Sequence, residues 1–337
     1  MDFREYIRTK LLKKKDRILE FGPLNWPIVT KERFSNAFYS DIRNSDDIKK
    51  LYTSNEYLES TGISINIDTI VDIDYVVGGT YKDSFKNVEK FDVVILGHVI
   101  EHIPNIIFFF QDVMNVLKKN GKLVIIYPDA RYCFDHFRNG TTFIDAYSAY
   151  KSDKMNANAV FDFVYNVVHE NDPKRFWNDA GVDDLLPKNK LSDATIARQK
   201  AEEGILPDDV HFWPFSDHQF IKFLYDMDRA GLLDLDISDF YETQNNTQEF
   251  MIILTPKKKK TLKYTKYQQI LGSINPVVKA GLAQKEKEAL TERILELEKV
   301  VGEARSELNS IYKSKKWRFV NRTAILKHRI SKRQQNE

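Results

Sequence analysis

The sequence predicts an α/β protein with an open, mostly parallel sheet covered by helices on both faces. Three observations favour this fold class. Short apolar runs typical of buried strands alternate with segments of helical spacing, the first run ends in a Gly-Pro turn, and an acidic residue closes the second run. Strands that alternate with helices favour parallel pairing, because each crossover brings the chain back to the same end of the sheet.

The first strand is expected within Arg17–Val29, which reads R-I-L-E-F-G-P-L-N-W-P-I-V. Its apolar residues lead into Glu20 and then into the turn at Gly22 and Pro23. Such a run fits a buried strand that stops at a tight loop beside a ligand.

The second strand is expected at Asn36–Asp41, so that it ends in a carboxylate. A glycine turn followed by an acid at the end of the next strand is typical of a βαβ nucleoside site. The turn lets the backbone approach the ligand, and the acid accepts hydrogen bonds from ribose hydroxyls. Asp41 is the candidate for that acid.

Further strands and helices complete the predicted sheet. Strands are expected at Ile67–Val77, Phe91–Gly97 and Gly121–Pro128. A helix is expected at Asn105–Lys119, because its apolar residues have helical spacing and Asn120-Gly121 follow as a stop signal. A second helix is expected at Asp217–Ala230. Two closing antiparallel strands at the sheet edge are expected at Leu235–Tyr241 and Glu249–Thr255.

The regular alternation lapses between residues 129 and 212. This stretch is rich in aromatic and charged residues and is too long for a simple connection. We expect it to form a cap insertion over the strand ends, where ligands bind. The globular domain is predicted to span residues 1–256, because the four-lysine run Lys257–Lys260 has no apolar partner.

A different pattern follows a predicted linker at 257–284. Within 285–312, apolar residues repeat with the a/d spacing of a coiled coil: Leu290, Ile294, Leu297, Val301, Ala304, Leu308 and Ile311. Three heptads usually need a partner to be stable. We therefore expect a coiled-coil-like helix that makes the protein a homo-oligomer; the alternative is a helix folded back on its own domain.

The end of the chain, 313–337, is a basic tail with nine Lys/Arg and one acid, although the whole chain carries only +2. The rest is therefore net acidic, which argues against a nucleic-acid partner. Trp317, Val320 and Ala324 could share one face of a basic amphipathic helix. Such a helix suits an anionic membrane surface or a protein partner; the alternative is a solvated end.

The compartment is predicted from cysteine use and hydropathy. A single cysteine, Cys133, excludes an internal disulfide framework and suits a reducing compartment. The N-terminus has no apolar signal core, and the longest purely apolar run, Ile106–Phe110, is too short to span a bilayer. We expect a cytoplasmic protein that is either free or peripheral at the inner face of the membrane.

Taken together, these features resemble the class I S-adenosylmethionine-dependent methyltransferases over roughly Leu19–Thr255. The resemblance is carried by L-E-F-G-P, F-Y-S-D, F-D-V-V-I-L-G-H-V-I-E-H-I-P and L-K-K-N-G-K-L-V-I-I-Y-P. It implies a Rossmann-like doubly wound, mostly parallel sheet and S-adenosyl-L-methionine as the cofactor. One departure is that Pro23 to Trp26 follow Gly22, where many members of the class carry further glycines.

A narrower resemblance concerns P-D-A-R-Y-C-F-D-H-F-R at Pro128–Arg138 and D-V-H-F-W-P-F at Asp209–Phe215. These look like a bacterial subgroup often encoded with, or fused to, glycosyltransferases of surface-polysaccharide assembly, and S-K-K-W-R at Ser314–Arg318 resembles the tails of such enzymes. The resemblance implies O-methylation of a sugar hydroxyl or phosphate-like group of capsule or O-antigen, and a tail that could dock on a glycosyltransferase. The alternative functions are a small-metabolite methyltransferase and a catalytically inactive methyltransferase-like scaffold in a polysaccharide assembly complex.

The resemblance also implies which residues bind the cofactor. Those expected near its methionine part are Glu20, Gly22 and Pro23. Asp41 is expected on the ribose and Asp74 near the adenine, although Asp72 lies on the same face of that predicted strand. His98 is expected to line the site at the turn after the fourth strand.

The run H-V-I-E-H, from His98 to His102, matches the H-x-x-E-H pattern of some zinc proteases. That pattern needs both histidines on one helix face, whereas here a strand runs directly into His98. No metal site is therefore expected, and His102 is expected to orient the turn by hydrogen bonding.

Charged and aromatic residues crowd the segment after the fifth strand, which faces the ligand crevice in open α/β sheets. The candidates for substrate binding are Arg131, Tyr132 and Arg138. Asp135 or His136 could take a proton, as could His211, which returns from the cap. The alternatives are an internal ion-pair network that anchors the cap and, for His211, a structural hydrogen bond.

Overall fold

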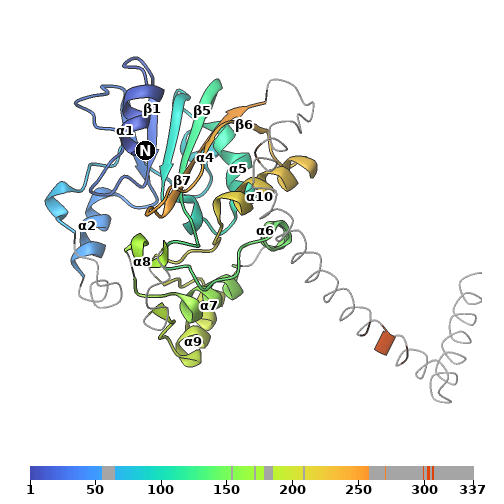
Figure 1. Cartoon of the computed structure of the whole chain (residues 1–337). Helices are drawn as coiled ribbons and strands as arrows, with labels where there is room; N and C mark the ends of the chain where they lie inside the picture. The colour runs from blue at the N-terminus through green and yellow to red at the C-terminus, as the bar shows by residue number, and fades with distance from the viewer. Residues whose placement is uncertain are drawn as a thin grey trace, which may run out of the picture. The chain divides into compact units, whose positions relative to one another are not determined.

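A computed structural model describes residues 1–257, apart from 55–64, 153–154, 171, 178–184 and 208, together with the single positions 270, 299, 302, 303 and 306. The chain divides into two compact units, Met1–Leu271 and Gly272–Glu337. The helices and strands labelled in Figure 1 belong to the first unit. The linker after Lys257, the heptad helix at 285–312 and the basic tail at 313–337 lie outside the described residues except at those single positions, and they stay predictions.

The described part of the chain is built on one seven-stranded sheet with the order β3-β2-β1-β4-β5-β7-β6. Its strands are β1 Ile18–Phe21, β2 Ala37–Asp41, β3 Tyr75–Val76, β4 Phe91–Gly97, β5 Leu117–Pro128, β6 Leu235–Tyr241 and β7 Glu249–Pro256. The pairs among β1 to β5 are parallel, whereas β7 is antiparallel to both β5 and β6. The predicted mostly parallel α/β sheet is confirmed, and β7 lies inside the sheet while β6 forms its edge.

The predicted strand at Ile67–Val77 is wrong in extent. The chain forms a 3₁₀ turn at Ile67–Thr69 and only a two-residue strand, β3. Asn66 starts the turn, since its side chain accepts a hydrogen bond from the Asp68 N–H. The alternation of aspartates with apolar residues imitates a strand, but this segment lies at the sheet edge and pairs with β2 at two positions alone.

The predicted helix at Asn105–Lys119 is too long. Helix α5 spans Ile106–Asp112, a 3₁₀ turn follows at Val113–Asn115, and the chain has entered β5 by Leu117. Leu117 already pairs with Phe91 of β4, so the last turn of the expected helix is part of the sheet. The start was predicted correctly, because the Asn105 side chain accepts from the Phe108 N–H at 3.0 Å as an N-cap.

Helices cover both faces of the sheet. Besides α5 they are α1 Phe3–Tyr6, α2 Ser45–Thr53, α4 Tyr81–Ser84, α6 Phe143–Lys151, α7 Ala157–Asn166, α8 Pro173–Trp177, α9 Leu191–Glu202 and α10 Asp217–Arg229, with a π-helical turn at Ile7–Leu11 and a 3₁₀ turn at Ile100–His102. The expected helix at Asp217–Ala230 is thus confirmed as α10. Its N-terminus has a capping box in which the Ser216 and Gln219 side chains each bond the other residue's backbone.

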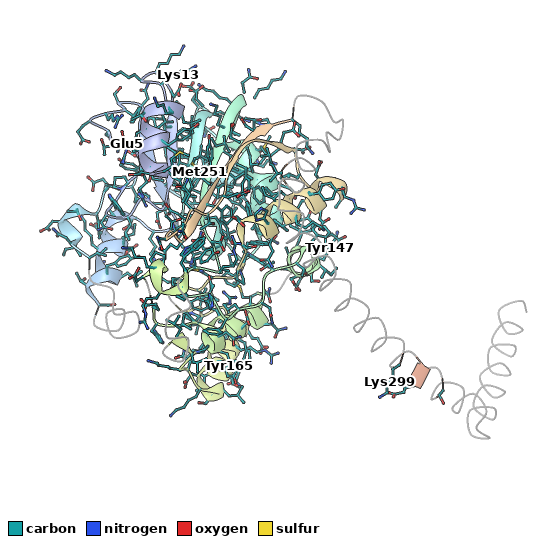
Figure 2. All side chains as sticks on the ribbon, viewed as in Figure 1. Glu5, Lys13, Tyr147, Tyr165, Met251 and Lys299 are labelled. Atoms are coloured by element: carbon teal, nitrogen blue, oxygen red, sulfur yellow. The ribbon has the colours of Figure 1, made fainter. Side chains whose placement is uncertain are left out.

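Alternate residues of the strands belong to two separate cores. Leu19, Val94 and Ile125 face one layer, in which α5 and α10 bury their aromatic residues. Val93 and Met251 face the other layer, which is closed by the N-terminal segment and by residues 28–34. Side chains fill the space on both faces, with Met251 inside and Lys13 pointing outward (Figure 2). This alternation, read from the strand periodicity, produces the doubly wound architecture.

The segment between β5 and α10 contains α6 to α9. Helices α7 and α9 pack on each other and, with α8, lie beyond one end of the sheet, whereas α6 packs against α5 and α10 (Figure 1). A small apolar cluster of Val168, Phe176 and Leu185 belongs to this segment. Among the described residues, no helix is both long enough and apolar enough to cross a membrane.

Candidate active site

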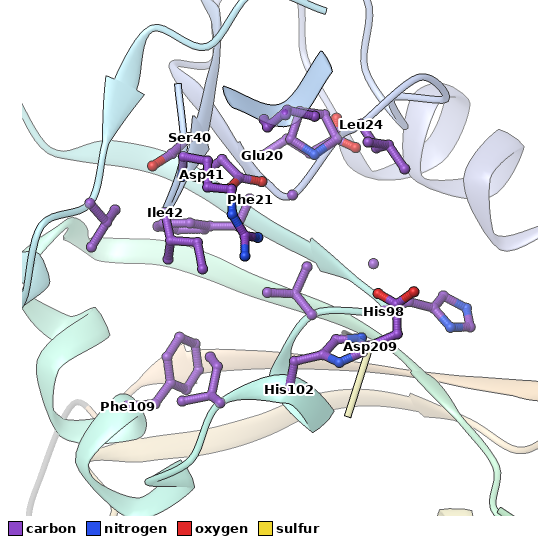
Figure 3. A pocket seen from close by; sticks show the side chains of 18 of the residues that line it. Glu20, Phe21, Leu24, Ser40, Asp41, Ile42, His98, His102, Phe109 and Asp209 are labelled. Carbon is purple, nitrogen blue, oxygen red and sulfur yellow. Dashed lines mark hydrogen bonds between the residues drawn. The ribbon is translucent and has the colours of Figure 1, made fainter. Parts of the chain in front are cut away.

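A cavity of about 890 Å³ opens at the carboxyl ends of β1, β2 and β4 (Figure 3). Strands β1 and β4 are neighbours, but the chain proceeds from β1 to β2 on one side and from β4 to β5 on the other. This is a topological switch point, where open α/β sheets bind their ligands. The cavity therefore lies where the sequence predicted a nucleoside site.

The loop after β1 forms one wall of the cavity and depends on Gly22. This residue has φ +60°, and a Cβ atom there would lie 2.9 Å from Cγ2 of Val99. The Gly22 N–H donates to the Ser40 carbonyl at 2.9 Å, which ties the turn to β2. Pro23 also lines the cavity. The left-handed backbone and the close approach explain why a glycine stands here.

Glu20, near the end of β1, fixes the conformation of this loop by hydrogen bonds. Its carboxylate is buried and accepts hydrogen bonds from the Ile28 N–H at 2.7 Å and from the Val29 N–H at 3.0 Å. Burial raises the pKa of Glu20 to about 7, although the two backbone donors oppose the shift. Glu20 lines the cavity, but its oxygens bind the loop itself, so its first role is to fix the loop's conformation.

Asp41 stands at the end of β2 and lines the cavity beside Ile42 and Arg43. The Arg43 N–H donates to Asp41 Oδ1 at 2.9 Å. Burial raises the pKa of this carboxyl, and the backbone N–H of Arg43 opposes the shift. The structure thus places Asp41 where a ribose-binding acid is expected.

Asp74 is not among the described residues that line the cavity. Its carboxylate accepts from the Tyr39 N–H at 2.8 Å and pairs with Lys31 Nζ at 2.8 Å. These contacts turn the side chain toward β2 and the loop after β1. The geometry does not support its expected place near an adenine, and Asp72 likewise is not among the lining residues.

His98 follows β4 directly, in a left-handed conformation with φ +55°. It lines the cavity, and its Nε2–H donates to Glu249 of β7 at 2.8 Å. Burial alone would lower the pKa of His98, but the hydrogen bond to Glu249 raises it. The expected turn residue is therefore at the cavity wall and is anchored to the antiparallel strand.

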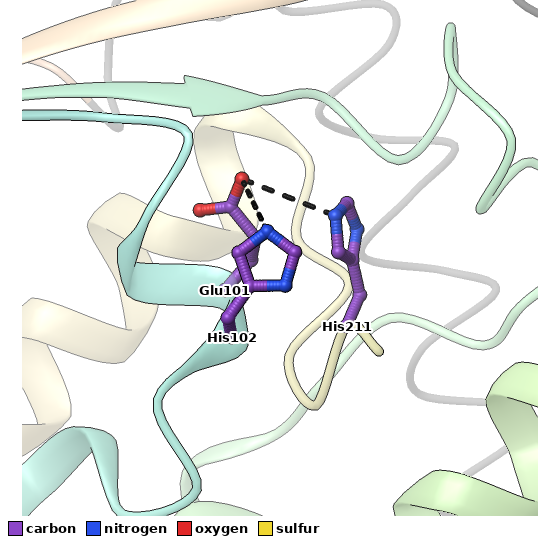
Figure 4. Close-up of side chains that lie close together, drawn as sticks. All are labelled: Glu101, His102 and His211. Carbon is purple, nitrogen blue, oxygen red and sulfur yellow. Dashed lines mark ion pairs between the residues drawn. The ribbon is translucent and has the colours of Figure 1, made fainter. Parts of the chain in front are cut away.

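Glu101, His102 and His211 meet behind this turn (Figure 4). Glu101 Oε1 lies 3.9 Å from His102 Nε2 and 4.0 Å from His211 Nε2. The carboxylate is buried, and burial raises its pKa. His102 lines the cavity; burial and the neighbouring His211 lower its pKa to about 3. His102 Nδ1–H donates to the Val210 carbonyl at 3.0 Å, as expected of a residue that orients the turn.

A buried ion-pair network ties the cap to this cluster. His211 Nδ1–H donates to Asp135 Oδ2 at 2.5 Å, and Arg138 Nη1–H donates to Asp135 Oδ1 and to the His211 carbonyl at 2.8 Å each. Arg138 Nε–H also donates to Asp162 of α7 at 2.8 Å. Burial would raise the pKa of Asp135, but His211 and Arg138 hold it well below its usual range.

This network bears on three predicted site residues. Arg138, Asp135 and His211 are almost fully buried and are not among the described residues that line the cavity. Arg138 has its charge matched within the protein, which contradicts a substrate clamp because no accessible charge remains. The geometry matches the alternative reading, an internal ion-pair network that anchors the cap.

The remaining cap candidates lie elsewhere. Arg131 donates to both oxygens of Asp129 and to Asp217 at 2.7 Å, which joins β5 to α10. Tyr132 stacks on Trp177 of α8 with ring centroids 3.8 Å apart, and His136 Nδ1–H donates to the Arg131 carbonyl at 2.5 Å. None of Arg131, Tyr132 and His136 is among the described residues that line the cavity.

Several lining residues were missed from the sequence. Arg4 of α1 reaches the loop after β1, where its Nη1–H donates to the Trp26 carbonyl at 2.8 Å. Asp209 and Val210 bring the end of the cap to the wall opposite that loop. Asp209 could have been predicted, because it is the acidic residue of the D-V-H-F-W-P-F motif. The sequence around Arg4 has no feature that indicates a ligand site.

Comparison with known proteins identifies the class. The methyltransferase domain family matches residues 1–182, more than half of the chain, so the chain belongs to that family. It is an S-adenosylmethionine-dependent methyltransferase, and the residues around its cavity fit that cofactor: a glycine turn with no room for a side chain, and an acid at the end of β2. No curated protein matches the chain.

Among solved structures, the chain is similar to an S-adenosylmethionine-dependent methyltransferase from Clostridium acetobutylicum, at 10% identity over 75% of this chain and 90% of that chain, with a TM-score of 0.36. It is also similar to the CcbJ methyltransferase from Streptomyces caelestis, at 11% identity over 75% and 88% of the two chains, with a TM-score of 0.36. The plantazolicin methyltransferase BpumL, in complex with SAH, matches at 8% identity over 76% and 80%, with a TM-score of 0.34. At these values the class assignment rests on the family match.

Proposed function

We propose that this methyltransferase transfers a methyl group to an oxygen of a bacterial surface-polysaccharide component, either a sugar hydroxyl or a phosphate-like group of the glycan or its precursor. The observation that carries the proposal is how two segments meet. Residues 128–138 and 209–215, on which the resemblance to polysaccharide-associated enzymes rests, are joined by the Asp135–His211 and Arg138–His211 hydrogen bonds. That junction brings Asp209 and Val210 to the cavity wall.

The cofactor would occupy the part of the cavity nearest β1 and β2. Asp41 would accept hydrogen bonds from its ribose hydroxyls, the backbone after Gly22 would contact its methionine part, and Arg4 would bind the carboxylate of that part. When bound, S-adenosylmethionine supplies a methyl group activated by the positive sulfur. The protein then has to align the acceptor oxygen with that methyl group and exclude water.

The acceptor would enter between the cofactor loop and the cap. This side of the cavity presents the His102 ring and the Asp209 carboxylate together with the apolar Leu206 and Phe108. A mixed wall of this kind suits a sugar, which has both hydroxyls and apolar faces. A direct proton transfer to His211 or Asp135 is disfavoured, because both are almost fully buried and neither is among the described residues that line the cavity. His211 supports the wall indirectly, since its ring packs edge-on against the His102 ring with centroids 4.7 Å apart, and Asp135 fixes the His211 ring by a hydrogen bond.

The C-terminal part of the chain bears on partners and location. We propose that residues 285–312 self-associate, and that the basic tail at 313–337 contacts a glycosyltransferase or the anionic inner face of the membrane. A cytoplasmic protein held near the membrane in this way would meet glycan precursors at their site of assembly. The single cysteine agrees with a reducing compartment.

Turnover with candidate acceptors tests the proposal. The full chain is incubated with methyl-labelled S-adenosylmethionine and either nucleotide sugars, glycan fragments or a matched set of small hydroxylated metabolites. We expect label on an oxygen of the sugar-containing acceptors, and at a cofactor concentration well below saturation Asp41→Ala should lower it strongly while the fold is retained. Label on the small metabolites alone would favour the small-metabolite alternative. Binding of S-adenosylhomocysteine without turnover on any acceptor would favour the scaffold.

A further inference from the structure

Three side chains converge behind the cavity wall, and the methyl-transfer proposal gives no role to one of them, the Glu101 carboxylate. Glu101 comes from the 3₁₀ turn after β4, His102 is its neighbour, and His211 comes from the end of the cap. One carboxylate oxygen and one nitrogen from each ring all lie within 4.8 Å of one another. Each of the three side chains therefore offers one lone-pair atom to a common point.

The two rings are fixed so that the same nitrogen, Nε2, faces this point. His102 Nδ1–H donates to the Val210 carbonyl at 3.0 Å, and His211 Nδ1–H donates to Asp135 at 2.5 Å. A neutral imidazole that donates through Nδ1 has its lone pair on Nε2. Metal-bound histidines in proteins almost always donate their other nitrogen to a carbonyl or carboxylate in this way. Both rings thus have the tautomer and the outer partner of a metal ligand.

Glu101 supplies the second, independent observation. Its side chain is 0% exposed, yet neither carboxylate oxygen has a hydrogen-bond partner among the described residues. A buried carboxylate without a donor is costly, and a bound cation is one of the few ways to compensate it. Ring nitrogens of three histidines, His98, His102 and His211, lie 3.8 to 4.0 Å from Oε1.

We propose that Glu101, His102 and His211 bind a divalent transition-metal ion, with Asp135 and the Val210 carbonyl as outer partners. Two imidazoles and one carboxylate favour zinc, or manganese, iron, cobalt or nickel, over magnesium and calcium. Ligand bonds of about 2.1 Å bring donor atoms to about 3.0–3.5 Å from one another. The observed separations are wider, at 3.9 and 4.0 Å from the Glu101 oxygen to the two ring nitrogens and up to 4.8 Å within the set, so binding needs the cap end to close onto the turn.

The ion would reach the site through the cavity, since His102 lines its wall and is about one-third exposed. Three protein ligands leave a coordination position for water or for an oxygen of a bound molecule. The ion would also join the turn after β4 to the cap, which already meet through the Phe212 N–H and the Glu101 carbonyl at 2.8 Å. Metal binding can be measured without turnover, so its test does not depend on which acceptor the enzyme methylates.

Metal titration of the full chain tests the inference. The protein is stripped with a chelator and titrated with Co²⁺ as a visible probe, and Zn²⁺ is then added as a competitor. We expect one ion to bind per chain and the visible Co²⁺ spectrum to disappear when Zn²⁺ displaces the cobalt. X-ray absorption spectroscopy at the zinc edge should show scattering from imidazole ligands. Glu101→Gln and His102→Gln should each raise the Kd about tenfold or more, and Asp135→Asn about 10- to 100-fold.

The controls separate ligand loss from loss of fold. His169→Gln removes an exposed histidine of the cap segment outside the cluster and should leave the Kd unchanged. Each variant is first checked for the wild-type circular dichroism spectrum. Two results would overturn the inference: no saturable Co²⁺ or Zn²⁺ binding by the folded full chain, or a Kd that Glu101→Gln and His102→Gln leave at the wild-type value.

Discussion

Three buried carboxylates near the cavity show how local donors decide the behaviour of an acid. Glu20 accepts two backbone hydrogen bonds, and burial still raises its pKa to about 7. Asp135 bonds His211 and Arg138, which hold its pKa well below the usual range. Glu101 has no hydrogen-bond donor among the described residues, and burial raises its pKa. Burial is common to all three, so the directly bonded side-chain donors make the difference: His211 and Arg138 both bond Asp135, whereas Glu20 accepts from backbone N–H groups.

The two aspartates expected at the cofactor can be separated by one measurement. Asp41→Ala should weaken S-adenosylhomocysteine binding by about 2 kcal/mol, or about 30-fold, because a charge-assisted hydrogen bond is lost. Asp74→Ala should leave the affinity within about twofold and lower the free energy of unfolding by about 1 kcal/mol, since it removes the bond to Tyr39. Calorimetric titration and urea unfolding measure the two quantities. If both variants lose affinity for S-adenosylhomocysteine equally, Asp74 contributes to cofactor binding after all.

The sequence could not decide between such residues because side-chain direction depends on the local backbone. The segment I-D-T-I-V-D-I-D-Y-V-V has the period of a strand, so Asp74 was expected at the ligand, with Asp72 on the same face as the alternative. A 3₁₀ turn at Ile67–Thr69 breaks that period before either acid. Asp41, in contrast, ends a strand that the apolar run defines clearly, and its position at the cavity follows from the topology.

His218 gives a residue-scale prediction on pH. Its Nδ1–H donates to the buried Asp217 at 2.7 Å, and this hydrogen bond raises the pKa of His218. A raised pKa in the folded state means that this contribution to stability is full below about pH 6.5, the unfolded value, and is lost as pH rises through the folded pKa. The free energy of unfolding should therefore fall more steeply above pH 6.5 in the wild type than in His218→Gln.

Denaturant titrations at a series of pH values measure this difference. Subtracting the profile of His218→Gln removes the contributions of the other titrating groups, which both proteins share. If the free energies of unfolding of the two proteins change in parallel above pH 6.5, the contact between His218 and Asp217 does not contribute to the pH dependence of stability.

At the scale of elements, the loop between β1 and β2 depends on one backbone position, Gly22. Gly22→Ala places a methyl group 2.9 Å from Cγ2 of Val99 at a φ of +60°. We expect a loss of about 1–2 kcal/mol in unfolding free energy and at least tenfold weaker S-adenosylhomocysteine binding, because the loop must shift. Gly78→Ala is the matched control, because no atom lies within 4 Å of a Cβ built at Gly78. Gly78 also stands between Val77 and Gly79, which both line the cavity. Equal affinities of the two variants would refute the role assigned to the turn.

Elements with a strong apolar pattern were predicted well, and elements defined by side-chain hydrogen bonds were not. Strands β1, β2, β4, β6 and β7 and helix α10 agree with the expected ranges within a residue or two. The expected helix at Asn105–Lys119 ends early because Leu117 pairs with β4. The cap network joins Asp135 to His211, and Arg138 to Asp162, across long sequence separations that periodicity does not reveal.

The buried Arg138 should be one of the main stabilising residues of the cap. Arg138→Met removes the partner of Asp135, which is then left buried beside His211 alone. We expect a loss of about 3 kcal/mol or more in unfolding free energy and faster amide exchange in α7, because breaking a buried pair leaves an uncompensated charge. Arg198→Ala removes an exposed pair with Glu202 on α9 and should cost no more than about 0.5 kcal/mol.

Urea unfolding and hydrogen exchange by mass spectrometry measure these effects. The cofactor loop after β1 serves as an internal reference, since Arg138 does not contact it. If Arg138→Met costs no more than Arg198→Ala, the network does not anchor the cap.

At the scale of the whole molecule, the last strands determine where the catalytic domain ends. Strand β7 inserts between β5 and β6, so the sheet is complete only when Glu249–Pro256 has folded. Lys257 still belongs to this unit, because its N–H donates to the Asp234 carbonyl at 3.0 Å and its ammonium pairs with the buried Asp228. The boundary at residue 256 stays a prediction: the first compact unit extends to Leu271, and Lys257 is kept in a truncated chain because of these contacts.

A chain truncated after Lys257 should bind S-adenosylhomocysteine with the affinity of the full chain, since the described residues that line the cavity all precede it. Light scattering should give a smaller oligomer for the truncated chain, because the apolar seam at 285–312 is removed. In the full chain, Leu297→Lys places a charge in that seam and should lower the mass in the same way, whereas Glu296→Lys, outside the a/d positions, should not. An unchanged mass in both the truncation and Leu297→Lys would refute the coiled coil. Weaker cofactor binding by the truncated chain would show that the second unit takes part in the site.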